Sequence, residues 1–213
     1  NATETATLDV RFTRGSKRSR TLRYRDRAGV RGRLVNSLGV PIVGARVALL
    51  TRDLRRNAPL VLRETLTTDA DGRFRTTVRA SASRLMQFGW TSHVNDVRFA
   101  ANAYLTLRAR ASASLRVSTR RPRLGRRFTI SGRLRGVSRR KVTVIVQGRA
   151  RGQRRYSTFA DTTTTRSGRF RVRYRFRDPG SRGRRFVFRA RIRPSATFPY
   201  ETGYSRTVTV RVR

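Results

Sequence analysis

The pattern that most constrains this chain is a strict alternation of arginine and apolar side chains at residues 169–177. The segment reads Arg-Phe-Arg-Val-Arg-Tyr-Arg-Phe-Arg. Successive side chains of a β-strand point to opposite faces, so the four apolar residues share one face and the five arginines share the other. A helix would scatter both sets around its circumference. The pattern therefore predicts a strand with one buried face and one solvated, cationic face, as in antiparallel sheets.

The same two-residue period recurs along the chain. Apolar residues occupy alternate positions within 6–12, 186–192 and 208–212. Turn residues separate such runs every 8–12 residues or so, which is typical of a β-sandwich. The nearest candidate for a helix is 80–88, which has partial helical spacing, and we expect at most one short turn of helix there. The predicted fold class is all-β, built from antiparallel β-sandwiches.

Five segments of the first half reappear, in the same order, in the second half. The matched pairs are 6–10 with 113–117, 30–34 with 130–134, 46–50 with 141–145, 68–74 with 164–170, and 104–108 with 206–210. A length of 213 residues suits two modules of about 100 residues each. We therefore predict two tandem sandwich domains, residues 5–110 and 111–213.

Glycines mark the expected turns. Gly72 follows Asp71 and Gly168 follows Ser167, and each pair lies between alternating runs. A glycine there supplies the positive φ of a tight hairpin turn, so we expect a hairpin at each position.

The net charge of +41 is carried almost entirely by arginine. Lys17 and Lys141 are the two lysines, so 50 of the 52 basic residues are arginine. Two interpretations remain open. Arginine forks pair bidentately with phosphate, sulfate or carboxylate, which favours a polyanion binder. Alternatively, a GC-rich genome replaces lysine by arginine on solvated faces. A field of this size attracts anions in either case.

Clusters of basic residues fall mainly in predicted loops. The candidate anion-binding residues are Arg18, Arg20, Arg126, Arg127, Arg139, Arg140, Arg154, Arg155, Arg184 and Arg185. A solvated loop is the alternative interpretation of each cluster. Nucleic-acid binding usually adds aromatic platforms or a groove-reading helix. Because the aromatic residues here alternate toward the predicted core, nucleic acid is the less expected partner.

No set of residues suggests catalysis. There are 11 acidic residues, no cysteine and one histidine, His93, which we interpret as a solvated loop residue. The absence of cysteine excludes disulfides and thiolate metal sites. We expect no enzyme and no cofactor.

Asp69 and Asp71 are the candidate metal ligands. The sequence D-x-D-G opens calcium-binding loops. However, Arg73 and Phe74 follow where further oxygen ligands would be needed. The favoured interpretation is turn chemistry, in which Asp bonds to the local backbone.

Two motifs in the first half resemble the carboxypeptidase regulatory-like domain family. Residues 39–47 follow its G-x-P-x-x-G-A-x-V pattern, and residues 68–74 follow T-D-x-x-G-x-F. The resemblance implies a seven-stranded, transthyretin-like sandwich of the broad immunoglobulin-like class. The second half keeps the Gly-Arg-Leu segment at 132–134 and the Gly-Arg-Phe segment at 168–170 but lacks the Pro and Gly-Ala elements.

The whole chain, including the segments Tyr156–Phe159 and Phe198–Tyr200, is also similar to repeat segments of exported actinobacterial proteins of unknown function. That resemblance implies an accessory role, as a spacer, stalk or adhesive unit, and family members carry no catalytic residues of their own. No signal peptide is visible at Asn1, and no apolar run approaches the roughly 20 residues that span a bilayer.

We therefore expect a non-catalytic structural or adhesive module pair that is extracellular or part of the cell envelope. Its expected partners are anionic envelope polymers. Two alternatives stay open: a nucleic-acid or sulfated-glycan binding protein, and the accessory domain of a larger secreted hydrolase.

Overall fold

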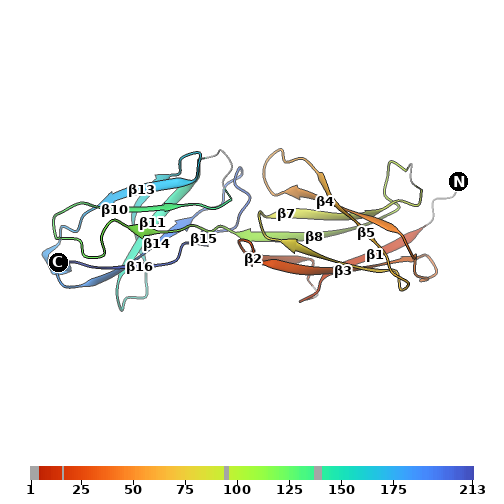
Figure 1. Ribbon diagram of the computed structural model, residues 1–213, viewed down its shortest axis with the longest axis horizontal. Coiled ribbons are helices and arrows are strands. Elements are labelled where there is room, and N and C mark those ends of the chain that lie inside the picture. Colours follow the sequence, from red (N-terminus) through yellow and green to blue (C-terminus); the bar gives the residue numbers. More distant parts are fainter. Residues whose placement is uncertain (1–4, 16, 94–95, 137–140) are drawn as a thin grey trace. The chain divides into compact units, whose positions relative to one another are not determined.

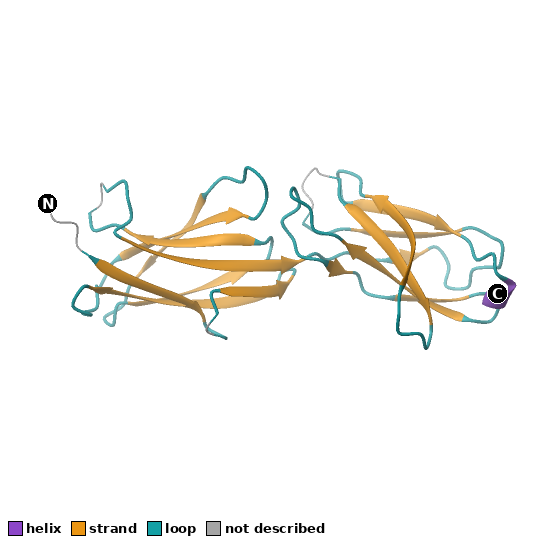
Figure 2. Cartoon of the chain, turned by 180° about the vertical axis from the view of Figure 1, so that it is seen from behind, coloured by secondary structure: helices purple, strands orange, loops and turns teal. Residues whose placement is uncertain are grey.

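The computed structural model describes residues 5–15, 17–93, 96–136 and 141–213 (Figure 1). Its internal contacts divide the chain into two compact units, Asn1–Ala109 (unit 1) and Arg110–Arg213 (unit 2). Each unit contains a three-stranded and a five-stranded sheet. One short 3-10 segment, η1 (Pro179–Ser181), interrupts the strands and loops of unit 2 (Figure 2). The predicted all-β fold class of tandem β-sandwiches is confirmed.

In unit 1 the order of strands is that of an immunoglobulin-like Greek key. The three-stranded sheet is β1 (Ala6–Phe12), β3 (Arg27–Asn36) and β6 (Arg73–Arg79). The five-stranded sheet is, in spatial order, β2 (Ser19–Arg23), β8 (Ala101–Arg110), β7 (Arg84–Trp90), β4 (Arg46–Asp53) and β5 (Val61–Thr67). The chain crosses between the sheets from β3 to β4 and again from β5 to β6, as in that class of sandwich.

The core of unit 1 lies between its two sheets. Leu8, Val10 and Phe12 of β1 are buried, as their alternation predicts. Phe74 of β6 stacks against Phe88 of β7 with ring centroids 6.0 Å apart, and this contact joins the two sheets. Full burial of each such side chain stabilises the fold by about 1.5–3 kcal/mol.

Unit 2 repeats this plan. Its three-stranded sheet is β13 (Arg169–Tyr174), β10 (Phe128–Arg133) and β9 (Arg116–Val117). Its second sheet contains, in spatial order, β12 (Ser157–Thr163), β11 (Thr143–Ala150), β14 (Arg185–Ile192) and β15 (Gly203–Tyr204), and β16 (Val208–Arg211) also pairs with β14.

The core of unit 2 is rich in aromatic rings. Phe128 lies 5.8 Å from Phe176 and 6.2 Å from Phe188, measured between ring centroids. Contacts of this kind add about 0.5–1.5 kcal/mol each beyond the area they bury. Every arginine of the segment 169–177 is exposed, while its apolar residues are buried or half-buried. The alternation that predicted this strand is confirmed.

Residues 80–88 contain no helix, within the expectation of at most one short turn there, because Met86 and Phe88 alternate into the core as part of strand β7. The expectation of hairpins at Gly72 and Gly168 was wrong. Gly72 and Gly168 do have positive φ, +70° and +80°. However, the strands on either side of each turn belong to different sheets. Each turn is therefore a corner between the two sheets and not a hairpin.

Equivalent contacts relate the two units. Gly32 faces Phe74 in unit 1, and Gly132 faces Phe170 in unit 2. The backbone N–H of Leu34 donates to the carbonyl of Gly72, and that of Leu134 donates to the carbonyl of Gly168, both at 2.8 Å.

The same equivalences correct the alignment of three matched segments. Leu8 pairs with Leu34, whereas the partner of Leu134 is Ala113. The segment 6–10 was therefore matched two residues out of register. A similar two-residue error affects 46–50, because the β-bulge at 49/50 corresponds to the bulge at 146/147. The segment 104–108 is one residue out, since Leu105 and Val208 hold equivalent places.

Candidate anion-binding faces

The outer face of the sheet β1-β3-β6 carries two cross-strand rows of charged side chains. The rows are Asp9–Arg33–Arg73 and Arg11–Arg31–Arg75. They line a groove of about 400 Å³. Like charges that face each other on neighbouring strands repel, so the row of three arginines favours a bound anion. We call this surface the unit 1 face.

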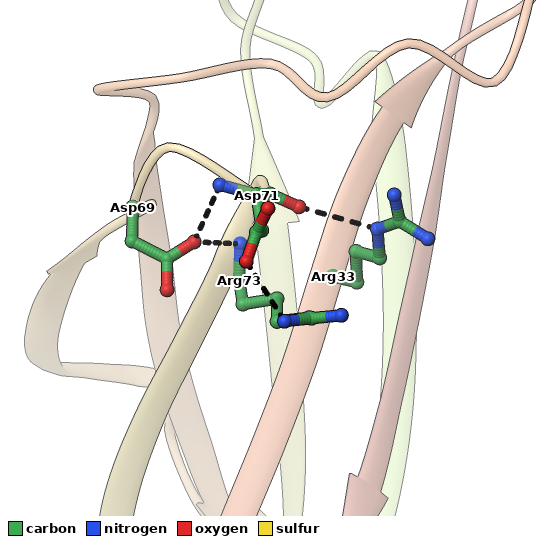
Figure 3. A network of polar contacts seen from close by, with 4 residues as sticks. All are labelled: Arg33, Asp69, Asp71 and Arg73. Carbon is green, nitrogen blue, oxygen red and sulfur yellow. Dashed lines mark hydrogen bonds and ion pairs between the residues drawn. The ribbon is translucent and has the colours of Figure 1, made fainter.

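A turn beside the unit 1 face supplies internal counter-charge (Figure 3). The Asp69 carboxylate accepts hydrogen bonds from the backbone N–H groups of Asp71, at 3.0 Å, and of Arg73, at 2.8 Å. The Asp71 carboxylate lies 2.8 Å from Nη1 of Arg73, and the backbone carbonyl of Asp71 accepts a hydrogen bond from Nε of Arg33 at 3.2 Å. The Asp69 carboxylate thus caps the backbone of the turn, and the Asp71 carboxylate pairs with the Arg73 guanidinium.

A second acid neutralises part of the same face. The Asp9 carboxylate lies 2.9 Å from Nε of Arg11. Three of the five arginines on the unit 1 face, Arg11, Arg33 and Arg73, therefore already have an oxygen partner in the protein.

The equivalent sheet of unit 2 presents a comparable array, which we call the unit 2 face. Its two rows are Ser114–Arg133–Arg169 and Arg116–Ser131–Arg171. They line a groove of about 640 Å³. A further groove of about 670 Å³ continues along the same strand and is lined by Arg127, Arg173, Arg175, Arg177 and Asp178, among others.

The unit 2 face lacks the carboxylates that neutralise the unit 1 face. Ser114 stands where unit 1 has Asp9, and Ser167 stands where it has Asp71. The imbalance extends to the whole of residues 110–213, which hold 31 basic and 3 acidic residues. The sheet scaffold is shared, but serines stand on the unit 2 face where unit 1 has the carboxylates that pair with Arg11 and Arg73.

The residues predicted as anion-binding lie mostly elsewhere. Arg127 lines the groove beside Arg173. Arg18 and Arg20 flank the start of β2, Arg126 precedes β10, Arg154 and Arg155 precede β12, and Arg184 and Arg185 lie at the start of β14. Arg139 and Arg140 lie outside the described residues.

Sequence reasoning placed Arg169 and Arg171 on a cationic strand face but did not include the arginines of the two faces among the candidate anion-binding residues. Runs of basic residues are conspicuous in a sequence, whereas a cluster assembled across strands requires the register of the sheet. The signal available was the alternation itself, because every outward position of 169–177 is arginine.

Arg189 is held between two tyrosine rings on the outer face of the five-stranded sheet of unit 2. Its guanidinium carbon lies 3.8 Å from the ring centroid of Tyr156 and 4.2 Å from that of Tyr204. Its Nε donates to the side-chain oxygen of Gln147 at 3.0 Å. Exposed cation–π contacts contribute about 0.5–1 kcal/mol each, so this arginine is engaged within the fold.

The loop around His93 brings three polar side chains together. The Asp96 carboxylate accepts hydrogen bonds from the backbone N–H of His93 and from Oγ of Ser92, both at 2.9 Å. The hydrogen bond from the His93 backbone is the main cause of a lowered pKa at Asp96, followed by the bond from Ser92. Oγ of Ser92 also lies 3.2 Å from Nδ1 of His93, which is 3.5 Å from the Asp96 carboxylate. These contacts hold the loop together through its own side chains and backbone.

The described residues contain no group of three or more His, Cys, Asp or Glu residues that could hold a metal ion. None of their helical segments is long and apolar enough to cross a membrane.

No family model matches the chain. A search of curated proteins also finds no match. Solved structures do match, each at 13% sequence identity. The adhesin InvE of Yersinia pseudotuberculosis matches over 95% of this chain with a TM-score of 0.43. An ectodomain fragment of ICAM-5 matches over 98% with a TM-score of 0.41.

A third solved structure is the alpha-2-macroglobulin of Escherichia coli activated by porcine elastase. It matches over 98% of this chain with a TM-score of 0.37. The chain spans 58% of the InvE chain, 51% of the ICAM-5 chain and 23% of the alpha-2-macroglobulin chain, thus less than two thirds of each.

Proposed function

We propose that this chain is a non-catalytic structural or adhesive module pair that binds anionic polymers through the unit 2 face. The observation that carries the proposal is the contrast between equivalent faces. Asp9 and Asp71 neutralise arginines in unit 1, and serines replace both acids in unit 2. Guanidinium groups without internal partners are available to phosphate, sulfate or carboxylate groups of a ligand.

The proposal includes membership of the carboxypeptidase regulatory-like family for unit 1. Contacts between its two motifs support this membership. Oγ1 of Thr68 donates to the carbonyl of Ile42 at 2.7 Å and accepts from the backbone N–H of Ala45 at 2.8 Å. A Cβ on Gly72 would collide with the backbone of Leu34 and crowd Pro41. The Pro-Gly-Ala segment and the T-D-x-x-G-x-F turn thus pack directly against each other, through Thr68 and Gly72 of the turn.

The proposed location is the cell envelope or the extracellular medium. An accessory adhesive module meets anionic polymers there, and the net charge of +41 suits that surface. Fractionation of the source cells with an antibody against the protein tests this location. Detection in the envelope or medium supports it, and confinement to the cytoplasm overturns it.

Retention on immobilised heparin in a sodium chloride gradient tests polyanion binding. The test variant removes three face arginines by Arg133→Gln, Arg169→Gln and Arg171→Gln. The matched control removes three exposed loop arginines of the same unit by Arg151→Gln, Arg154→Gln and Arg155→Gln. Both variants lose the same charge, so a difference between them reports the face itself.

We expect the face variant to elute at clearly lower salt than the loop variant. Equal shifts for the two variants would mean that the overall field alone holds the polymer, which overturns the assignment of the face. Loss of wild-type retention below about 0.15 M salt would overturn polyanion binding as the function.

A further inference from the structure

We propose that the unit 2 face selects a base-free phosphodiester polymer with six backbone bonds between successive phosphates, such as a poly(glycerol phosphate). This inference rests on the proposed function and names its ligand class. It is carried by the spacing of arginines along β13 and by the alternation of burial that continues through residues 175–177. Arg169, Arg171, Arg173, Arg175 and Arg177 are all exposed, and the residues between them are buried or half-buried. We call these five residues the arginine comb.

The comb repeats at the pitch of two strand residues. Since a strand rises about 3.3–3.4 Å per residue, neighbouring guanidinium stems are about 6.7 Å apart. Antiparallel pairing to β10 fixes this geometry from Arg169 to Tyr174. The alternation of burial continues to Arg177, and the carbonyl of Phe176 accepts a hydrogen bond from Gly125 at 2.8 Å.

A polyol phosphodiester has a repeat of matching length. Its backbone runs through six bonds from one phosphorus atom to the next, and two peptide residues also contain six backbone bonds. Because an extended peptide residue spans at most about 3.3–3.6 Å, six bonds span about 7 Å. One phosphate can therefore meet each arginine along the comb. Inorganic polyphosphate has two bonds per repeat, so its charges do not follow this pitch one for one.

The strand beside the comb supplies hydroxyl groups. Thr129 is the cross-strand partner of Arg173, and Ser131 is the partner of Arg171. Arg116 lies beyond Ser131 on β9. A chain lying along the comb would therefore have guanidinium groups on both sides at this row and a hydroxyl donor beneath it. Hydroxyl and guanidinium donors together suit phosphate oxygens.

The outward positions of the comb carry no ring on which a base could stack. The aromatic residues of this segment point inward, and Phe170 and Phe176 are buried. Tyr174 packs edge-on against Phe128 at 5.9 Å and Phe159 at 4.9 Å between ring centroids. Single-stranded nucleic acids are usually held by stacking as well as by charge. Tyr174 and Phe176 border the groove but are packed against core rings, so the surface suits the shared phosphodiester backbone better than the bases.

Unit 1 lacks this continuous comb. Its strand β6 carries Arg73, Arg75 and Arg79 on the same side, with Thr77 in place of the third member. Arg73 is also paired with Asp71. On the unit 2 comb one carboxylate, Asp178, lines the groove at the Arg177 end, where it accepts a hydrogen bond from the backbone N–H of Gly180.

Fluorescence anisotropy of the full chain at fixed salt tests the inference. The labelled probes are poly(glycerol phosphate) oligomers of increasing length, an oligothymidylate, inorganic polyphosphate and heparin fragments. We expect affinity for the glycerol phosphate series to rise with each repeat and to level off at about five, when every arginine of the comb is occupied.

Paired substitutions that move one arginine to the neighbouring strand keep the net charge constant. They therefore separate the effect of arginine spacing from the effect of the protein's overall electrostatic field. The pair Arg173→Thr with Thr129→Arg moves one guanidinium to the neighbouring strand at constant net charge, and Arg171→Ser with Ser131→Arg does the same one row along. Each should weaken poly(glycerol phosphate) binding about fivefold, through one lost charge-assisted contact, and leave heparin binding almost unchanged. Circular dichroism and thermal melting check that each double variant is folded. If one double variant does not fold, the other still tests the inference.

The outcomes distinguish this inference from the proposed function. Binding to no polyanion in the wild-type chain would overturn both. Polyanion binding that the transpositions do not change would overturn the comb while leaving the proposed function intact. Tighter binding of oligothymidylate than of a glycerol phosphate oligomer with the same number of phosphates would show that bases are read and would overturn the choice of a base-free polymer.

Discussion

Gly32 and Gly132 show how a single residue determines core packing in each sandwich. A Cβ on Gly32 would overlap the ring of Phe74, and a Cβ on Gly132 would overlap Phe170 and the backbone of Ser114. The phenylalanine ring in each unit therefore lies across the space that a side chain would need. The ring can occupy this space only because the residue facing it is a glycine. This dependence explains why the glycine and the phenylalanine both appear in both halves of the sequence.

Substitution of either glycine should destabilise its unit. We expect Gly32→Ala and Gly132→Ala each to lower the free energy of unfolding by about 1–3 kcal/mol, because overpacking displaces a core ring. Urea denaturation measures the effect. Gly180→Ala is the control, since its Cβ would meet only the Asp178 side chain at 3.2 Å or more. A loss equal to that of the control would show that the ring yields easily.

The stacked guanidinium of Arg189 should not be replaceable by an ammonium group. We expect Arg189→Lys to cost about 1–2 kcal/mol, because two stacking contacts and the bond to Gln147 are lost or weakened. Thermal unfolding tests this value against Arg173→Lys, an exposed arginine without such contacts. Equal melting temperatures for the two variants would contradict the role of the stack.

Among the elements, the strands could be read from sequence better than their register. Alternation identified the inward residues of 6–12, 169–177 and 186–192. It could not fix the alignment between the halves, because a pattern of period two looks the same after a shift of two residues. The segments 6–10 and 46–50 were misaligned by that amount. The segment 68–74 was aligned correctly because its glycine and phenylalanine are not interchangeable.

Because strand register could not be predicted, the two charged faces could not be predicted either. Arg11, Arg31 and Arg75 are far apart in sequence and become one row only through the pairing of β1, β3 and β6. A sequence shows that each outward position is basic, but the neighbours across strands depend on register. The loop clusters were conspicuous in sequence for the opposite reason, since their members are adjacent in the chain.

Removal of the internal acids should convert the unit 1 face into one like that of unit 2. The variant Asp9→Ser with Asp71→Ser frees Arg11 and Arg73 from their ion pairs. We expect later elution from heparin and a loss of stability below about 1 kcal/mol, because exposed ion pairs contribute little.

A matched control for that variant is Asp26→Ser with Glu64→Gln, which removes two acids from elsewhere in unit 1 that are not among its ion pairs. It makes the same change in net charge. If the two double variants elute at the same salt concentration, the internal ion pairs do not govern binding.

At the scale of the whole molecule, charge is distributed unequally between similar scaffolds. Residues 110–213 contribute +28 of the net charge of +41. Each unit has its own buried core, which supports the proposal that the units are independent domains. Sequence reasoning placed the boundary at 110/111, and the contacts divide the chain at 109/110.

Each unit should fold when produced alone. We expect fragments 1–109 and 110–213 to show β-type circular dichroism and a cooperative thermal transition. A fragment without a cooperative transition would contradict the proposed domain independence. The second fragment needs salt or a polyanion in the buffer, because its self-repulsion opposes the compact state.

The dependence of binding on salt, measured for equivalent substitutions in the two units, tests the central claim most directly. One variant carries Arg133→Gln, Arg169→Gln and Arg171→Gln, and the other carries the equivalent changes Arg33→Gln, Arg73→Gln and Arg75→Gln. With a poly(glycerol phosphate) ligand, we predict that the unit 2 variant lowers the slope of log K against log salt by about 2, at roughly 0.7 per lost phosphate contact, and that the unit 1 variant changes it by less than half as much. Equal changes of slope for the two variants would contradict the account.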